Sequence, residues 1–269
     1  MFTHYRTVGL IFKKEERGEF DQLFNIFSKD FGKLEILGKG IKKISSKLRS
    51  GMEIFYLSEI EFIQGKRYKT LTDALPIEKF KNLRKDLKKL VIAYKISEDL
   101  DNFVKGEEPD EKIWQLLLEV FNILNNWKIE NSLKSKVKRI ENSLSIENWK
   151  LKIIYYYFFW NFISILGFKP ELYFCSICQK KLIPEKLYFS QKEGGIICDN
   201  CSKMAKSALK IEPEIVKILR KILEKNWEIL LKLKIKENYL KSLEKISQNY
   251  SLFISDKEHD NIKKNSQRG

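Results

Sequence analysis

The fold of residues 171–204 is decided by two short stretches, Cys175-Ser176-Ile177-Cys178 and Cys198-Asp199-Asn200-Cys201. Two residues between the thiols of each pair let one tight turn direct both sulfur atoms at the same ion, and two such turns make a closed tetrahedral site. Zinc suits four thiolates and does no redox chemistry there. The spacing therefore predicts one structural zinc ion per chain. A disulfide pair, an iron–sulfur cluster and chance spacing are the alternatives that it leaves open.

The segment between the two cysteine pairs, residues 181–197, alternates enough in polarity to form a hairpin, and Gly194-Gly195 suits its turn. A thioredoxin-like redox role would need only one cysteine pair, close to a βαβ pattern, and the sequence has no such pattern. Residues 171–204 are therefore predicted to form a small zinc-finger module.

Toward the N-terminus, residues 1–79 contain short apolar runs that predict five β-strands. Groups rich in glycine and polar residues separate these runs, and the connection from Gly40 to Gly51 is long enough for a helical turn. Five strands with an extra element between the third and fourth match the layout of an OB-fold barrel. The runs are Thr7–Phe12, Leu23–Phe27, Leu34–Leu37, Glu53–Ile63 and Tyr68–Leu75.

After Pro76 the apolar spacing changes to three and four, which is typical of helices. A first helical stripe consists of Leu83, Leu87, Leu90, Val91 and Tyr94. Further helices are predicted at about 110–127, 145–166 and 212–248, the last with Pro213 in its first turn. The predicted fold is α+β and multidomain, with an N-terminal OB-fold barrel followed by an all-helical domain that carries the inserted zinc finger. The ranges are 1–79 for the barrel, 80–170 and 205–250 for the helical domain, 171–204 for the zinc finger and 251–269 for a flexible tail.

The charge of the chain predicts an anionic partner. Lysine and arginine number 51 against 36 acidic residues, which gives a formal net charge of +15 and suits nucleic acid or an acidic membrane surface. The segment from Gly38 to Ser50 holds five cations and no acidic residue, a density that can neutralise several phosphates. A solvated loop is the alternative interpretation. The predicted DNA contacts are Lys33, Lys39, Lys42, Lys43, Lys47 and Arg49, with a secondary basic surface at Lys134, Lys136, Lys138 and Arg139.

Aromatic residues in and beside the predicted strands have two interpretations, base stacking and core packing. They are Tyr5, Phe12, Phe31, Phe55 and Tyr68, and the sequence alone does not separate the two roles. The run from Tyr155 to Trp160 is predicted to be core of the helical domain.

Motifs for catalysis are missing from the sequence. Only two histidines occur, His4 and His259, and no phosphate-binding loop is found. The most apolar stretch, Ile153–Phe168, is shorter than the roughly 20 residues of a membrane span, and the N-terminus does not read as a signal peptide. These observations favour a cytoplasmic, non-enzymatic protein with no membrane association.

Several stretches of the chain resemble the RecO family of bacterial DNA repair proteins. The most specific is Leu166-Gly167-Phe168-Lys169-Pro170-Glu171-Leu172 leading into Cys175 and Cys178, followed by Phe189-Ser190, Gly194-Gly195 and Cys198 with Cys201. Further matches are Gly18-Glu19-Phe20-Asp21, Ile26-Phe27-Ser28, Phe31-Gly32-Lys33, Gly38-Lys39-Gly40 through Ser45-Ser46, and Leu83-Arg84-Lys85-Asp86-Leu87. The resemblance covers about residues 5–204.

The resemblance implies an OB-fold, a helical domain with an inserted zinc finger, and a nucleoid-associated bacterial protein. It implies binding to single- and double-stranded DNA, annealing of complementary strands without ATP, and cooperation with RecR. Through these the protein would help RecA displace the single-stranded-DNA-binding protein, whose acidic C-terminal tail the family recognises. The loop lysines would contact DNA, and the four cysteines would hold zinc for folding rather than chemistry, because some members lack them.

One departure from the family pattern is Gln179, which stands where the family usually has glycine after the second cysteine. Glycine there would ease a left-handed turn. Two other function classes stay open at this stage. One is a nucleic-acid-modifying enzyme that uses the zinc ribbon for docking, and the other is an accessory protein with an RNA-binding barrel.

Overall fold

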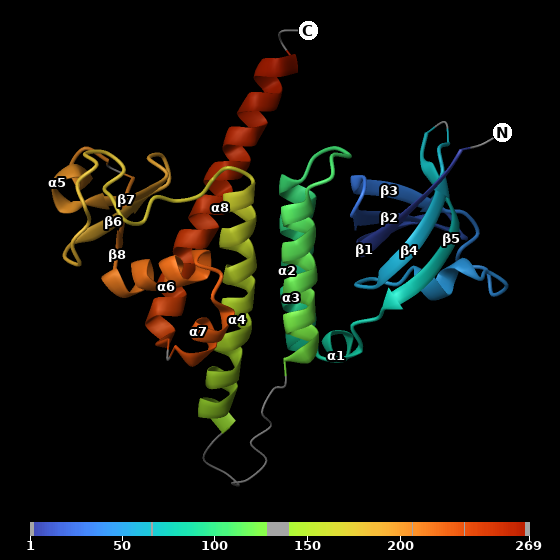
Figure 1. Cartoon of the computed structure of the whole chain (residues 1–269), viewed down its shortest axis with the longest axis horizontal. Helices are drawn as coiled ribbons and strands as arrows, with labels where there is room; N and C mark the ends of the chain where they lie inside the picture. Colours follow the sequence, from blue (N-terminus) through green and yellow to red (C-terminus); the bar gives the residue numbers. More distant parts are fainter. Residues whose placement is uncertain (1–2, 66, 128–139, 206, 234, 267–269) are drawn as a thin grey trace. The chain divides into compact units, whose positions relative to one another are not determined.

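The computed structural model describes residues 3–127 and 140–266, apart from residues 66, 206 and 234. It divides into two compact units, Met1–Lys128 and Ile129–Gly269. The helices and strands of each unit carry the labels of Figure 1.

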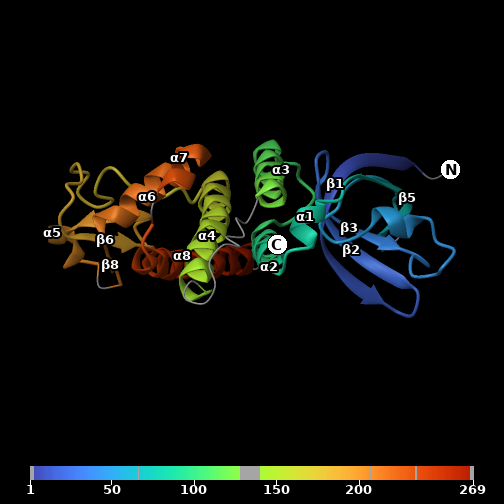
Figure 2. The same cartoon turned by 90° about the horizontal axis from the view of Figure 1, so that it is seen from below.

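The first unit contains a closed five-stranded barrel in the order β1-β2-β3-β5-β4 (Figures 1 and 2). Neighbouring strands are antiparallel except β3 and β5, which run parallel where Ile36 pairs with Lys69. A 3₁₀ helix, Leu48–Gly51, lies between the third and fourth strands, so the predicted OB-type barrel is confirmed. The strands are β1 (His4–Arg17), β2 (Asp21–Ser28), β3 (Gly32–Gly38), β4 (Leu57–Ile63) and β5 (Lys69–Glu78), and the 3₁₀ helix is η1.

Alternation of apolar and polar residues determines which face of each strand enters the barrel. On β3, for example, Leu34 and Ile36 are fully buried whereas Glu35 between them is exposed. The fourth strand begins at Leu57 rather than at the predicted Glu53, because Phe55 has a left-handed backbone (φ 62°) that no strand can continue through.

Three helices complete the first unit: α1 (Lys81–Arg84), α2 (Leu87–Phe103) and α3 (Glu111–Asn126). The side chain of Asp86 accepts hydrogen bonds from the backbone of Lys88 and Lys89 and so starts α2. Asp110 caps α3 in the same way.

The apolar stripe predicted for the first helix is buried only in part: Leu83 is fully buried and Leu90 is half-buried, but the other three residues are exposed. Leu87, Val91 and Tyr94 are 77%, 49% and 47% exposed, and the chain is interrupted between α1 and α2. The buried face of α2 is formed instead by Ile92, Ala93, Ile96, Leu100 and Phe103, together with the polar residues Lys89, Ser97 and Asp99. Polar side chains share the buried face of α2. The apolar residues in the sequence therefore indicate the neighbouring face of the helix instead.

Asp101 near the end of α2 connects this helix to the barrel. Its carboxylate accepts hydrogen bonds from the Nζ atoms of Lys13 on β1 (2.8 Å) and Lys33 on β3 (2.7 Å). The chain after α2 also approaches the barrel closely, since a Cβ at Gly32 would lie 2.2 Å from the backbone oxygen of Glu108. Gly32 has φ +62° as well, so both space and backbone conformation call for glycine.

The second unit begins with the long helix α4 (Ile140–Ile165), whose aromatic run packs inward. Residues 156–160 are all at most 3% exposed, which confirms the prediction that this run is core. A small three-stranded sheet, ordered β7-β6-β8, lies in the cysteine module. The elements after α4 are β6 (Leu187–Ser190), β7 (Gly195–Cys198), α5 (Asp199–Ser202), β8 (Leu209–Ile211), α6 (Pro213–Leu223), α7 (Trp227–Lys232) and α8 (Glu237–Ser266).

The last helical region differs from the prediction in two ways. It is divided into α6, α7 and α8 rather than continuous, and α8 extends to Ser266, past residue 251 where a flexible tail was expected. Ile254 is fully buried, so apolar packing stabilises α8 beyond its predicted end. Pro213 lies in the first turn of α6, as predicted. The domain boundaries drawn from the sequence otherwise stay predictions.

In the part of the chain that the structure describes, no helix has the length and apolarity needed to cross a membrane.

Candidate metal centre and nucleic-acid interface

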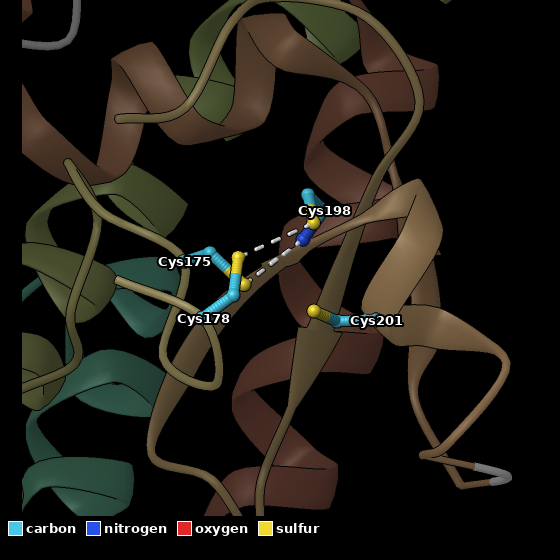
Figure 3. A group of neighbouring side chains, drawn as sticks. All are labelled: Cys175, Cys178, Cys198 and Cys201. Atoms are coloured by element: carbon cyan, nitrogen blue, oxygen red, sulfur yellow. Dashed lines mark hydrogen bonds between the residues drawn. The ribbon is translucent and has the colours of Figure 1, made fainter. Parts of the chain in front are cut away.

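The four cysteines predicted as zinc ligands come together in the second unit (Figure 3). Their sulfur atoms all lie within 4.8 Å of one another, and Sγ of Cys178 is 3.9 Å from Sγ of Cys198. Zinc–thiolate bonds of about 2.3 Å in a tetrahedron place neighbouring sulfurs about 3.8 Å apart. The cluster therefore has the size and the donor set for a metal such as zinc. All four thiols are free, so the structure contains no disulfide at this cluster.

Backbone geometry positions the first pair of cysteines. The amide of Gln179 donates to the carbonyl of Cys175 (2.9 Å), which closes the turn between the two thiols. Gln179 has a left-handed backbone (φ 58°). The left-handed turn expected at this position is therefore present although the residue is not glycine.

The second pair comes from the end of β7 and the start of α5. The predicted hairpin is formed by β6 and β7, with Gly194 (φ +69°) in its turn. The backbone amide of Cys198 points at Sγ of Cys175 (3.5 Å) (Figure 3). The hairpin thus brings the two cysteine pairs together from opposite sides of the site.

Two of the thiols have shifted pKa values in opposite directions. Burial disfavours the thiolate of Cys175, but backbone N–H groups of Cys178, Cys198 and Ile177 outweigh it and lower its pKa to about 6. Burial, followed by hydrogen bonds with the other cysteines, raises the pKa of Cys201 to about 12. Burial disfavours the charged thiolate form of both cysteines. A metal cation at the centre of the cluster would favour that form and so offset the effect of burial.

The predicted basic loop is the connection between β3 and η1, and most of its cations are exposed. Its backbone is held to the barrel, because Ile41 is buried in the core and the amide of Gly40 donates to Asp21 (2.7 Å). Lys42 pairs with Glu16 (2.6 Å) and lowers the pKa of that carboxyl group. Lys39, Lys47 and Arg49 form no ion pair with any residue that the structure describes. The loop therefore presents free cations on a fixed backbone.

The structure places the other predicted contacts differently. The side chain of Lys33 is only 15% exposed and is held by Asp101. Lys134, Lys136, Lys138 and Arg139 lie outside the described residues. The DNA contacts of these side chains stay predictions.

The aromatic residues of the barrel separate into core and surface positions. Phe12 and Phe55 are buried, at 1% and 0% exposure. Tyr5 is 36% exposed and stacks on Phe62, and Tyr68 is partly exposed beside Arg67. Tyr5 and Tyr68 are thus accessible, whereas Phe12 and Phe55 are packed inside.

A pocket of about 320 Å³ in the first unit was not anticipated from the sequence. It is lined by residues from β3, from the β4–β5 connection together with the first residue of β5, and from the α2–α3 connection. Four cations contribute to it: Lys33, Arg67, Lys69 and Lys105. They come from three separate segments, so no local run of charge marks them.

The barrel, the helices and the cysteine cluster define a class: an α+β protein that combines an OB-type barrel with a four-cysteine module able to hold a metal such as zinc. Comparison with known proteins names the family. The family model "Recombination protein O N terminal" matches residues 1–80, and "Recombination protein O C terminal" matches residues 146–253. The chain belongs to the RecO family of DNA repair proteins.

Proteins named DNA repair protein RecO are similar to this chain over nearly its whole length. The one from Dehalococcoides mccartyi (strain ATCC BAA-2266) is 29% identical over 254 residues, which cover 94% of this chain and 92% of that protein. The one from Alkaliphilus metalliredigens is 27% identical, covering 94% of each chain. The one from Acetivibrio thermocellus is 28% identical, covering 92% of this chain and 90% of that protein. The resemblance inferred from the sequence motifs is confirmed.

Proposed function

We propose that the protein is a DNA-binding recombination mediator that anneals complementary strands without ATP and catalyses no covalent change. The observation that carries this proposal is the basic β3–η1 loop on an OB-type barrel, in a chain of the RecO family. Lys39, Lys47 and Arg49 are free to neutralise phosphates, and their backbone is fixed by Ile41 and Gly40. Phosphate contacts of this kind are independent of sequence, as strand annealing requires.

The physical basis for annealing is charge neutralisation. Two complementary strands repel each other, and a basic surface that holds both lowers this repulsion. Pairing itself is downhill by about 1.4 kcal/mol per stacked step, so no nucleotide hydrolysis is needed. Family membership supports cooperation with RecR in helping RecA onto strands coated by the single-stranded-DNA-binding protein, whose acidic tail would be a second contact. We place this work in the bacterial cytoplasm, at the nucleoid.

The four-cysteine cluster would hold one structural zinc ion through Cys175, Cys178, Cys198 and Cys201. Four thiolates leave no open coordination position for water, so the metal's chemistry is limited to cross-linking the module. The chain's own part is to supply the left-handed turn at Gln179 and the amide of Cys198, which orient the sulfur atoms.

The test is strand annealing by the full-length protein, with and without ATP, on bare DNA and on DNA coated by the binding protein. We expect acceleration without ATP and unaltered product strands. Lys39→Glu with Lys47→Glu should weaken binding to single-stranded and duplex DNA alike, and the matched control Lys85→Glu with Lys112→Glu should not, because these exposed residues lie on other parts of the same unit. Shortened or modified DNA would instead indicate an enzyme, and absence of DNA binding would refute the proposal.

A further inference from the structure

The pocket of about 320 Å³ beside the barrel has the position of a ligand site. OB-type barrels bind single strands on the face of their second and third strands and at the connection between their fourth and fifth. This pocket is lined by Lys33 and Glu35 of β3 and by Gln64, Arg67 and Tyr68 of the β4–β5 connection. The basic β3–η1 loop, by contrast, lies at the far end of β3.

One side of the pocket comes from outside the barrel. Val104, Lys105, Gly106 and Glu107 of the α2–α3 connection line it. This connection is held in place by the close approach of the Glu108 backbone to Gly32 and by an ion pair between Lys69 and Glu107. The pocket is therefore a fixed cleft between the barrel and this connection, both of which belong to the first unit.

The cations of the pocket fall into two groups. Lys33 and Lys69 are engaged by Asp101 and Glu107, and their side chains are only 15% and 13% exposed. Arg67 and Lys105 are exposed and form no ion pair with another described residue; Nζ of Lys105 donates to the backbone carbonyl of Asp101 (3.2 Å), which leaves its charge unpaired. The first group shapes the cleft, and the second group is free to meet an anion.

Arg67 also has an aromatic neighbour. Its guanidinium lies 5.3 Å from the centre of the Tyr68 ring, and Tyr68 is partly exposed. A guanidinium and a phenol ring side by side at the rim offer both a phosphate contact and a surface on which a base stacks. The chemistry of the rim thus fits a nucleotide better than a simple anion.

We propose that this pocket binds one nucleotide of a single strand, with Arg67 and Lys105 at its phosphate and Tyr68 beside its base. This inference rests on the proposed DNA-binding function and names the substrate class of a second contact on the same barrel. A volume of about 320 Å³ is at the lower end of the roughly 300–1,000 Å³ of small-molecule sites. A single unpaired nucleotide enters a cleft of that size, whereas a duplex keeps its bases stacked and paired outside it.

The pocket and the basic loop lie along one strand of the barrel. Glu35 lies on β3 and Lys39 follows the strand's last residue, four residues further on, so the two are at most about 13 Å apart at roughly 3.3 Å per residue. A single strand crosses that distance in a few nucleotides. The pocket is therefore predicted to select unpaired DNA, while the loop holds phosphates of either form.

The experiment compares full-length wild type with Arg67→Ala/Lys105→Ala by fluorescence anisotropy, using a labelled oligothymidylate and a labelled duplex. Removing both cations from this one phosphate contact should weaken single-strand binding about fivefold at 0.1 M salt, because log K falls with log salt by about 0.7 per phosphate. Duplex affinity should stay within about twofold, because the loop still supplies the electrostatic contacts. Lys85→Ala/Lys112→Ala removes two exposed charges from the same unit and should change neither affinity.

Tyr68→Leu adds a second measurement, because it keeps an apolar side chain but removes the ring. Weaker single-strand binding by this variant, at unchanged salt dependence, would support base stacking beside Arg67. Unchanged single-strand affinity in Arg67→Ala/Lys105→Ala, or an equal loss on duplex, would overturn the pocket. Wild-type protein that binds no DNA would refute the proposed function instead, so the two failures are distinguishable.

Discussion

The barrel and the four-cysteine module reach a defined shape by different means. The barrel closes all its strands in one ladder and buries an apolar core of eleven residues, including Phe24, Leu34 and Phe62. Among the described residues, the module's own cluster buries Cys175, Ile197 and Cys201, two of which are cysteines, while Phe189 is buried against Trp160 and Tyr250 of the helices. A core that small does not stabilise a fold without a cross-link. We therefore expect the barrel to depend on packing and the module to depend on a bound metal.

The largest effect is expected from removing a metal ligand. Cys201→Ser should release zinc and unfold residues 171–204, because structural zinc contributes on the order of 10 kcal/mol to a small module. The barrel should keep its DNA affinity, since its core is complete without the module. Metal analysis and limited proteolysis would follow the module, and anisotropy would follow the barrel.

The serine variant has a clear contrary outcome. Wild-type protein that contains no zinc when purified fully reduced and without chelators would refute the structural-metal proposal. A barrel that loses DNA binding in Cys201→Ser would show that the comparison between the two regions is wrong.

The converse experiment is a cavity in the barrel. Phe24→Ala removes a fully buried ring and should lower the free energy of unfolding by about 3–5 kcal/mol. Zinc content should be unchanged, because the module belongs to the other compact unit. Chemical denaturation monitored by circular dichroism would measure the loss, with the exposed Phe20→Ala as the control. Zinc loss in Phe24→Ala would contradict independent folding of the two regions.

A smaller effect is expected at the junction between α2 and the barrel. Asp101→Asn removes the carboxylate that holds Lys13 and Lys33 and should cost about 1–2 kcal/mol, since the site is partly solvent-screened. Burial opposes the carboxylate, but Lys13 and Lys33 outweigh it and lower the pKa of Asp101.

This lowered pKa sets the pH dependence. The carboxylate's contribution is complete above the ordinary value of 3.8 and is lost as the pH falls through the lower pKa of the folded state. The difference in unfolding free energy between wild type and Asp101→Asn should therefore be full at neutral pH and shrink below about pH 4. A difference that stays constant down to about pH 2 would assign the effect to packing rather than charge.

The sequence predicts the features that depend on local signals, but not those that depend on tertiary packing. Strand alternation and glycine-rich turns are local signals, so the barrel, the hairpin and the cysteine pairs could be predicted. The orientation of α2 could not, because Lys89, Ser97 and Asp99 share its buried face and hide the periodicity. The pocket could not either, since Lys33, Arg67 and Lys105 lie far apart in sequence and meet only when the barrel closes and Gly32 admits the Glu108 backbone.

The smallest expected effect sharpens the contrast at one backbone position. Gln179 closes the first cysteine turn with a left-handed backbone (φ 58°), a conformation that costs a residue with a Cβ about 1–2 kcal/mol. Glycine avoids this cost, but it also gives the unfolded chain more conformational freedom, which destabilises the folded module by about 0.4–1 kcal/mol. The only side-chain hydrogen bond that the change removes among the described residues is the long one from Nε2 of Gln179 to the Ser176 carbonyl (3.4 Å). Gln179→Gly should therefore tighten zinc binding by about 0.5–1 kcal/mol, or roughly two- to fivefold, in competition with a chromophoric chelator.

Gln179→Ala keeps the strained backbone without the amide and should show no gain. Equal zinc affinity in the glycine and alanine variants would mean that the turn is not a source of strain, and the module would then rest on its ligands alone.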